Sequence, residues 1–338
     1  MRNGSIDEPQ WGQACAAPGT GVVPGVAAVR RRVAAAGAGP ALGVALTAST
    51  AAVAVALPVP GAQAAGGPSG VRAKGAYLLD SGANRPLWSK AADTRRPMAS
   101  TTKIMTAMII LDGRGTDLGR RITVKKSYRD YVVRHGASTA DLRVGDKLTV
   151  RQLLYGLLLP SGCDSAYALA DTFGRGNTEA RRTKSFISKM NARASSLGLR
   201  NTRYDSFDGI SHGGNYSTPR DLVRLARYAL GNRTFASIVK SSVTRQKAVN
   251  VNRTYTWYNT NELLGSYRGA IGIKTGTGKA SGSCLVFAAR RGNRTVIGTV
   301  LNAPNRYADA AKMLDHAFHT RTRTTVGPRR LPAGAQRD

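Results

Sequence analysis

Three short motifs carry side chains suited to acyl transfer, and they occur in one order along the chain. Ser100 and Lys103 stand three positions apart, Ser161-Gly162-Cys163 follows about sixty residues later, and Lys274-Thr275-Gly276 precedes the last apolar runs. A serine hydroxyl is a poor nucleophile at neutral pH and needs a base within hydrogen-bond reach. Because residues three apart share one face of a helix, Lys103 can serve as that base. The set predicts a serine acyltransferase activated by lysine rather than histidine.

Each motif alone also has an ordinary explanation. A Ser-x-x-Lys pattern is expected by chance in a chain of this length, and Ser237 with Lys240 provides a second example. Ser161 suits a serine that caps a helix end, and Lys274-Thr275-Gly276 suits a surface turn. The order, the spacing and the setting of all three motifs favour the catalytic interpretation.

The chemistry gives each motif a role. A lysine accepts a proton only when neutral, and both the apolar run beside Lys103 and a nearby Lys274 would favour the neutral form. At a helix N-terminus, Ser100 would lie beside unpaired backbone N–H groups that stabilise an acyl oxygen. Ser161 could relay the proton to the leaving amine. In the third motif, lysine and threonine can bind a carboxylate, while Gly276 lets an extended substrate approach.

The elements that must position these residues follow from the apolar pattern. A strand over 75–80, a turn and a second strand at 86–88 predict a hairpin, and apolar strands recur at 284–289 and 295–301. Between them, the pattern predicts helices at 100–111, 150–159, 183–197 and from 218 onward, with a closing helix at 307–318. A lone hairpin is too small to be stable, so we expect it to join the C-terminal strands in one sheet. The result is a mixed α/β (α+β) fold with an inserted helical lobe at about 112–265 and a cleft where the motifs meet.

The N-terminal stretch has the layout of a secretory signal. Three arginines at 30–32 precede an apolar run at 33–57, and the small-residue site Ala62-Gln63-Ala64 follows. We therefore expect an extension and signal over 1–64, a catalytic domain over 65–320 and a disordered basic tail over 321–338. The alternative is an uncleaved membrane anchor at 33–57, which is long enough to span.

Composition limits the partners. The chain has 338 residues, with 50 Lys and Arg against 19 Asp and Glu, a net charge of +31. This charge would attract the protein to anionic wall polymers or to a membrane surface. The positive residues are scattered along the chain, however, which is more typical of an ordinary solvated surface than of a specific binding site. No motif for reading nucleic acid accompanies the charge. The three cysteines, Cys15, Cys163 and Cys284, imply no disulfide framework, no metal site and no cofactor. The four histidines have no obvious catalytic partner; they are His135, His212, His316 and His319.

From Ala73 to Phe318 the chain resembles the D-alanyl-D-alanine carboxypeptidases among the low-molecular-mass penicillin-binding proteins, serine peptidase family S11. Beyond the three motifs, the resembling stretches are residues 97–107, 153–158, 190–191, 197–199, 208–209, 259–261, 263–264 and 272–276.

The resemblance implies about five antiparallel strands flanked by helices, with a helical subdomain. It implies that Ser100 is acylated by the terminal D-Ala-D-Ala of peptidoglycan stem peptides and by β-lactam antibiotics, with Lys103 as base and Ser161 as proton relay. Lys274-Thr275 would bind the substrate carboxylate, and the N–H groups of Ser100 and Thr277 would form the oxyanion hole. No metal or cofactor is implied.

Two departures from the family pattern matter. Cys163 stands where the family usually has asparagine, and a thiol is a weaker donor and acceptor than an amide. We expect slower turnover and a bias of the acyl-enzyme towards amine acceptors over water. The chain also ends soon after Phe318, so we expect no C-terminal β-domain or amphipathic anchor of the kind found in longer members.

Two other functions are alternatives. A class A β-lactamase shares the first and third motifs, but the stretches around Glu179 and Glu262 do not match its deacylating glutamate segment. We therefore expect penicillin to form a long-lived adduct on Ser100. A non-catalytic basic wall-binding module would instead leave Ser100 inert towards penicillin.

Overall fold

The computed structural model describes residues 66–321 and 329–336. The expected signal segment therefore lies outside the described residues. Within the described part of the chain, no helix is long and apolar enough to cross a membrane.

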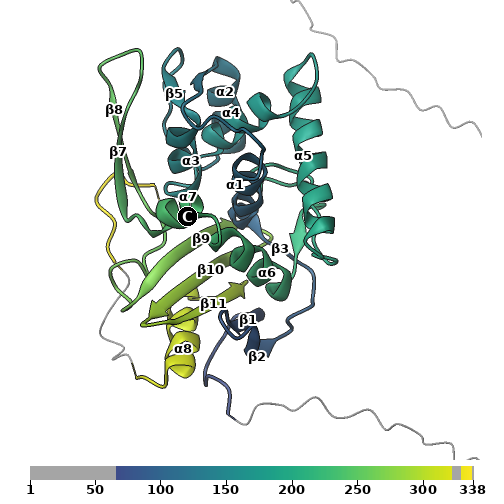
Figure 1. Cartoon of the computed structure of the whole chain (residues 1–338), viewed down its shortest axis with the longest axis vertical. Coiled ribbons are helices and arrows are strands. Elements are labelled where there is room, and N and C mark those ends of the chain that lie inside the picture. The colour runs from purple at the N-terminus through teal and green to yellow at the C-terminus, as the bar shows by residue number, and fades with distance from the viewer. Residues whose placement is uncertain (1–65, 322–328, 337–338) are drawn as a thin grey trace, which may run out of the picture. The chain divides into compact units, whose positions relative to one another are not determined.

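A five-stranded antiparallel sheet forms the base of the fold, in the order β2-β1-β11-β10-β9 (Figure 1). Its strands are β1 (Gly75–Asp80), β2 (Arg85–Lys90), β9 (Ala270–Gly278), β10 (Gly282–Arg291) and β11 (Arg294–Leu301). The N-terminal hairpin joins the C-terminal strands through β1 and β11, in a register that runs from Gly75 opposite Leu301 to Asp80 opposite Val296. The mixed α/β architecture expected from the sequence is confirmed.

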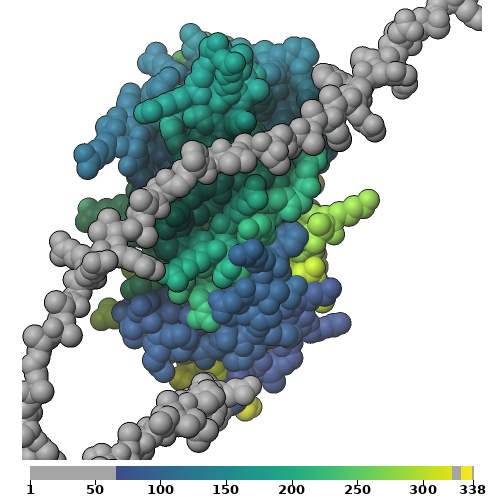
Figure 2. All heavy atoms as spheres, turned by 90° about the vertical axis from the view of Figure 1, so that its right-hand side faces the viewer, coloured from purple at the N-terminus to yellow at the C-terminus, as the bar shows by residue number. Residues whose placement is uncertain are grey.

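Both faces of the sheet are covered. Helix α8 (Arg306–Phe318) packs on one face, where Met313 and Leu314 join Phe287 and Val300 in a buried apolar cluster. On the other face, α6 (Pro219–Leu230) packs against β11 and β1, and α7 (Arg233–Lys240) packs against β9. Figure 2 shows the molecule from the side, with teal helices above and the blue N-terminal segments below. The sheet is therefore buried between α8 on one face and the helices of the lobe on the other.

The remaining elements lie between β2 and β9 in sequence (Figure 1). The helices are α1 (Lys103–Leu111), α2 (Lys126–His135), α3 (Val150–Leu158), α4 (Cys163–Phe173) and α5 (Glu179–Ser196), with a 3₁₀ turn at Ala99–Thr102 before α1. Three small antiparallel pairs join them: β3 (Arg96–Pro97) with β6 (Tyr216–Ser217), β4 (Arg121–Thr123) with β5 (Lys147–Thr149), and β7 (Val243–Lys247) with β8 (Thr254–Tyr258).

Local sequence explains several helix ends. The side chain of Thr149 and that of Gln152 form a reciprocal capping box at the start of α3. Thr218 caps α6 with Pro219 in its first turn, as the sequence predicted. Helix α1 is apolar nearly all round and is buried at the centre of the lobe, which also agrees with the prediction.

Other parts differ from the sequence-based expectation. The single helix expected over 100–111 is a 3₁₀ turn followed by α1. Helices α4 and α7 and the β7–β8 hairpin were not anticipated, because their short stretches mix polar and apolar residues without a long periodic run. Within the tail expected to be disordered, residues 329–336 contact the domain; the main-chain N–H of Arg329, for example, donates to the oxygen of Glu262 at 3.0 Å.

Candidate active site

The first motif lies at the junction of the 3₁₀ turn and α1. Ser100 is half-buried in the turn, and Lys103 is the first residue of α1. The Lys103 Nζ atom lies 2.8 Å from Ser100 Oγ, as the three-residue spacing predicted. The second Ser-x-x-Lys pattern is different in kind, because Ser237 and Lys240 are both exposed on α7.

Lys103 is fully buried, and its amine has three neighbours at hydrogen-bond distance. Nζ lies 2.8 Å from Ser100 Oγ, 2.8 Å from the main-chain oxygen of Asp208 and 3.3 Å from Cys163 Sγ. Nζ donates to all three neighbours. A direct hydrogen bond thus joins Lys103 to Ser100, the two residues that the sequence predicted as base and nucleophile.

The third motif lies on β9, the edge strand of the large sheet, which packs against the 3₁₀ turn. A Cβ atom at Gly276 would lie 3.0 Å from Ser100 N and 3.1 Å from Thr101 N. The absence of a side chain at Gly276 therefore admits the nucleophile's own backbone, whereas the sequence suggested that it admits the substrate. Gly209 meets the same turn from the other side, because a Cβ there would lie 2.2 Å from the oxygen of Ala99.

Lys274 and Thr275 are buried, which differs from the exposed strand that the sequence suggested. Lys274 Nζ donates to the main-chain oxygen of Thr275 at 3.0 Å, and Thr275 Oγ1 lies 2.6 Å from Thr260 Oγ1. The loop before β9 therefore covers this part of the edge strand. Thr277 is exposed and lines the same cavity as Ser100.

Ser161, in the second motif, is fully buried with a backbone φ of 65°, which is unusual for a residue with a side chain. Its main-chain oxygen accepts a hydrogen bond from Ser138 Oγ at 2.7 Å. Its Oγ has no hydrogen-bond partner among the described residues. Its proposed role as a relay remains a prediction.

Cys163 is the first residue of α4. Burial raises the pKa of its thiol to about 12, although the Lys103 charge and hydrogen bonds act to lower it. At neutral pH the group is therefore a thiol and not a thiolate, and it is not an independent nucleophile. Its sulfur lies 3.7 Å from Ser138 Oγ, and the residue lines the cavity.

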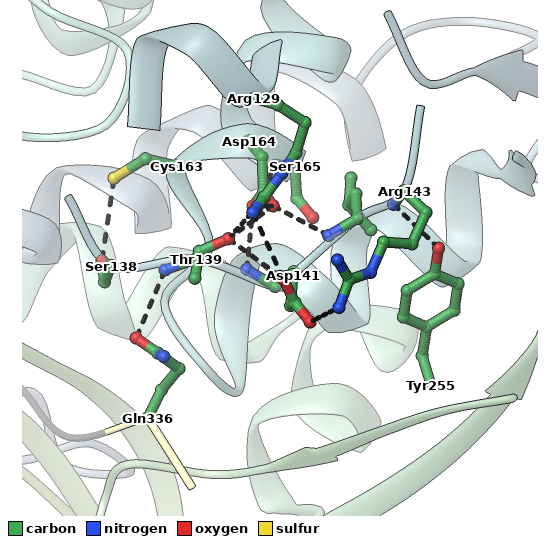
Figure 3. A network of polar contacts seen from close by, with 12 residues as sticks. Arg129, Ser138, Thr139, Asp141, Arg143, Cys163, Asp164, Ser165, Tyr255 and Gln336 are labelled. Atoms are coloured by element: carbon green, nitrogen blue, oxygen red, sulfur yellow. Dashed lines mark hydrogen bonds and ion pairs between the residues drawn. The ribbon is translucent and has the colours of Figure 1, made fainter. Parts of the chain in front are cut away.

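Asp164 is a functional position that the sequence reasoning missed. The carboxylate is fully buried beside the second motif and holds the loop at 138–142 (Figure 3). It accepts hydrogen bonds from Ala140 N at 2.8 Å and Leu142 N at 3.1 Å, and Arg129 Nη1 lies 3.1 Å away. The signal available in the sequence was an acidic residue in the first turn of a helix.

Arg306 is a second missed position. Its guanidinium is mostly buried at the start of α8, and Nη1 donates to the main-chain oxygens of Gly276 at 3.0 Å and Cys284 at 3.2 Å, and to Thr277 Oγ1 at 2.9 Å. Arg306 therefore ties the end of β9 to β10. Nothing in its local sequence separates it from the many surface arginines.

A cavity of about 710 Å³ opens at the junction of these elements. Its wall includes Ser100 from the 3₁₀ turn, Cys163 from α4 and Thr277 from β9. Ser138, Gly209 and Gln336 also contribute to it. Ser100 of the first motif and Cys163 of the second thus share this cavity with Thr277, which follows the third motif. Gly276 of the third motif packs against the backbone of Ser100, but Lys274, Thr275 and Gly276 are not among the residues that line the cavity. Among the described residues, no three His, Cys, Asp or Glu side chains cluster as metal ligands.

Comparison with known proteins identifies the family. The family model described as D-alanyl-D-alanine carboxypeptidase matches residues 61–305. The chain is 53% identical over 255 residues to a D-alanyl-D-alanine carboxypeptidase of Streptomyces sp. strain K15, covering 73% of this chain and 88% of that protein. It is 34% identical to carboxypeptidase DacF of Bacillus subtilis, covering 73% of this chain and 62% of the relative.

Solved structures agree. The crystal structure of the Streptomyces K15 DD-transpeptidase matches with a TM-score of 0.73 and 53% identity, over 75% of this chain and 99% of that one. A D-alanyl-D-alanine carboxypeptidase of Mycobacterium tuberculosis matches with a TM-score of 0.66 and 28% identity, over 78% and 99% of the two chains. With the family model, the sequence identities and the fold in agreement, the chain belongs to the D-alanyl-D-alanine carboxypeptidase family of serine peptidases.

Proposed function

We propose that this protein acylates Ser100 with peptidoglycan stem peptides that end in D-Ala-D-Ala and releases the terminal D-alanine. The observation that supports this best is the fully buried Lys103 amine at 2.8 Å from Ser100 Oγ. A base must lie within hydrogen-bond reach of a serine hydroxyl to take its proton, and the Lys103 amine does so. The family to which the chain belongs carries the same activity in its description.

In the first step, Ser100 Oγ attacks the carbonyl carbon of the penultimate D-alanine, and its proton passes to Lys103 Nζ. The main-chain N–H groups of Ser100 and Thr277 stabilise the developing oxyanion. Ser161 then passes its proton to the amide nitrogen as the peptide C–N bond breaks and takes up the proton that Lys103 received. D-alanine leaves as an amine, and Lys103 and Ser161 return to their starting states. Lys274 and Thr275 hold its carboxylate. The product is an ester between Ser100 and the shortened stem peptide.

The test is release of D-alanine from a D-Ala-D-Ala tripeptide, together with labelling by fluorescent penicillin. Ser100→Ala should abolish both signals, because Ser100 is the cavity hydroxyl that the described residues place beside a buried amine. Ser237→Ala is the matched control, since Ser237 has the same lysine spacing on an exposed helix. Labelling that survives Ser100→Ala would refute the assignment and would leave a non-catalytic wall-binding module as the better explanation.

The fate of the acyl-enzyme depends on Cys163, which contacts Lys103 at 3.3 Å in the cavity wall. A neutral thiol holds an incoming water less firmly than an amide would, so transfer to an amine acceptor is favoured over hydrolysis. The relative from strain K15 is named as a DD-transpeptidase in its solved structures, some of which carry cysteine replacements. Cys163→Asn should raise hydrolysis relative to transfer in assays with and without an amine acceptor. Unchanged rates for both reactions would contradict this role.

Penicillin should form a stable adduct on Ser100. No glutamate is among the described residues that line the cavity, and Glu179 instead accepts hydrogen bonds from Lys125 and Tyr167. A water activated for deacylation therefore has no carboxylate base of the class A β-lactamase kind. Mass spectrometry of the intact protein should detect the adduct for hours. Rapid release of hydrolysed penicillin would favour a β-lactamase instead.

The substrate lies outside the cytoplasm, so the protein acts after export. Residues 30–64 have the composition of a secretory signal. The whole chain has a net charge of +31, and the excess of Lys and Arg attracts the exported domain to anionic wall polymers or lipid headgroups. N-terminal sequencing of the extracellular protein should find a start near Ala65. An intact N-terminus in the membrane fraction would indicate an anchor, and salt-insensitive binding to walls would argue against attachment by charge.

A further inference from the structure

Residues 329–336, here named the docked tail, lie against the catalytic domain although they follow the stretch matched by the family model, which ends at residue 305. The docked tail begins at Arg329 and ends at Gln336. Each of these two residues contacts a loop that belongs to the active site. The docked tail therefore runs from the loop before β9 to the wall of the catalytic cavity.

Arg329 contacts the loop that covers the third motif. Its Nη2 donates to the main-chain oxygen of Asn259 at 2.6 Å, and its main-chain N–H donates to Glu262 at 3.0 Å. Thr260 lies between these two contacts, and its hydroxyl is 2.6 Å from that of Thr275. Arg329 therefore binds the loop that contacts Thr275, a residue proposed to bind the substrate carboxylate.

Gln336 contacts the loop that supports the second motif (Figure 3). Its Oε1 accepts a hydrogen bond from Thr139 N at 3.4 Å, and the residue lines the 710 Å³ cavity with Ser100. The neighbouring Ser138 contacts both Ser161 and Cys163. The far end of the docked tail is thus part of the cavity wall.

Between its ends, the docked tail is held by one apolar side chain and one turn. Leu331 is 5% exposed, and Ala335 N donates to the oxygen of Pro332 at 3.2 Å. The stretch from Ala333 to Gln336 also lines a second cavity of about 560 Å³, together with β8 and the loop at 139–143. Gln336 therefore lines both this cavity and the one that contains Ser100.

We propose that the docked tail is an intramolecular competitor of the peptide substrate. Its Gln336 end lies in the cavity wall beside Thr139, and its Arg329 end is bound to the loop at 259–262. The Gln336 end must leave before a stem peptide binds along that wall. This inference rests on the proposed function, since it concerns access to the same serine. Only molecules with the docked tail released would be competent, so the apparent KM rises by the inverse of the competent fraction while kcat is unchanged.

The test compares the full chain with Arg329→Ala and with a chain that stops at Thr320. Arg330→Ala is the matched control, because Arg330 is the exposed neighbour and carries the same charge. With the D-Ala-D-Ala tripeptide, we expect Arg329→Ala and the shortened chain to lower KM about 3- to 30-fold at equal kcat, as for a competent fraction of about 3 to 30%. Arg330→Ala should leave KM within about 1.5-fold.

Hydrogen–deuterium exchange gives a readout that does not need activity. The Thr139 amide donates to Gln336, so exchange of the loop at 139–143 should speed up in Arg329→Ala and not in Arg330→Ala. Equal KM and equal exchange in all variants would overturn the proposal, as would an equal effect of the two arginine variants. If Ser100 is not labelled in any variant, the proposed function has failed, and the exchange result alone decides whether the docked tail closes the rim.

Discussion

Gly276→Ala should slow acylation of Ser100 because it adds a carbon where the third motif touches the nucleophile's backbone. The new Cβ would lie 3.0 Å from Ser100 N and 3.1 Å from both Met98 O and Thr101 N, whereas ordinary contacts begin at 3.4 Å. The turn must therefore shift by roughly the 0.4 Å difference, and backbone atoms of a packed turn have little room to move. Overpacking of this kind costs about 1–3 kcal/mol.

If about 1–2 kcal/mol of this strain persists in the transition state, the rate falls about 5- to 30-fold. The assay is the second-order rate constant for labelling by fluorescent penicillin, with the unfolding temperature recorded for each variant. Gly278→Ala is the matched control on the same strand, since its Cβ would meet the Ser281 hydroxyl at 3.1 Å, which can rotate away, and Ala99 Cβ at 3.9 Å. Equal labelling rates for Gly276→Ala and Gly278→Ala would refute the reasoning.

Three further outcomes are expected. Asp164→Asn should lower the free energy of unfolding by about 3 kcal/mol in denaturant titrations, because it removes a buried charge that pairs with an arginine; a loss below about 1 kcal/mol would contradict this. Arg306→Met should slow penicillin labelling, because it releases the end of β9, and an unchanged rate would show that β10 alone holds Thr277 in place. Burial acts to raise the pKa of Asp171, but hydrogen bonds from Arg182 and two other donors outweigh it and hold that pKa below 3.8. The ionised Asp171 therefore stabilises the folded state above the pKa of the unfolded chain, and this stabilisation is lost as pH falls. Asp171→Asn should have a lower free energy of unfolding than the unmodified chain at pH 7, and the difference should shrink below about pH 4. A difference that does not change with pH would contradict this reasoning.

The parts of the fold that the sequence predicted are those with local signals. The apolar strands at both ends, the all-apolar α1 and the Thr218-Pro219 start of α6 each follow from a pattern within a few residues. The pairing of Ser100 with Lys103 is local in the same sense, since helical geometry sets their distance. The meeting of motifs far apart in sequence could be inferred only because one sheet had to unite both ends.

What the sequence did not predict depends on contacts between distant segments. The oxygen of Asp208 contacts Lys103 across 105 positions, and a main-chain oxygen has no signature in the side-chain pattern. Asp164 looks like a surface acid, because charged residues are rarely fully buried, and only the fold surrounds it with donors. The tight approach at Gly276 was likewise attributed to the substrate, since the sequence does not reveal which backbone comes near.

The position of β1 between β2 and β11 also determines when the sheet can form during synthesis. Ala73, just before β1, donates to Asp309, 236 positions later, and the whole of β1 pairs with β11. Until β11 has been made, β1 has one open edge, and an open apolar edge invites pairing with other chains. Contacts this distant in sequence slow folding. The helical lobe can therefore fold before the sheet, which is complete only after β11 has been synthesised.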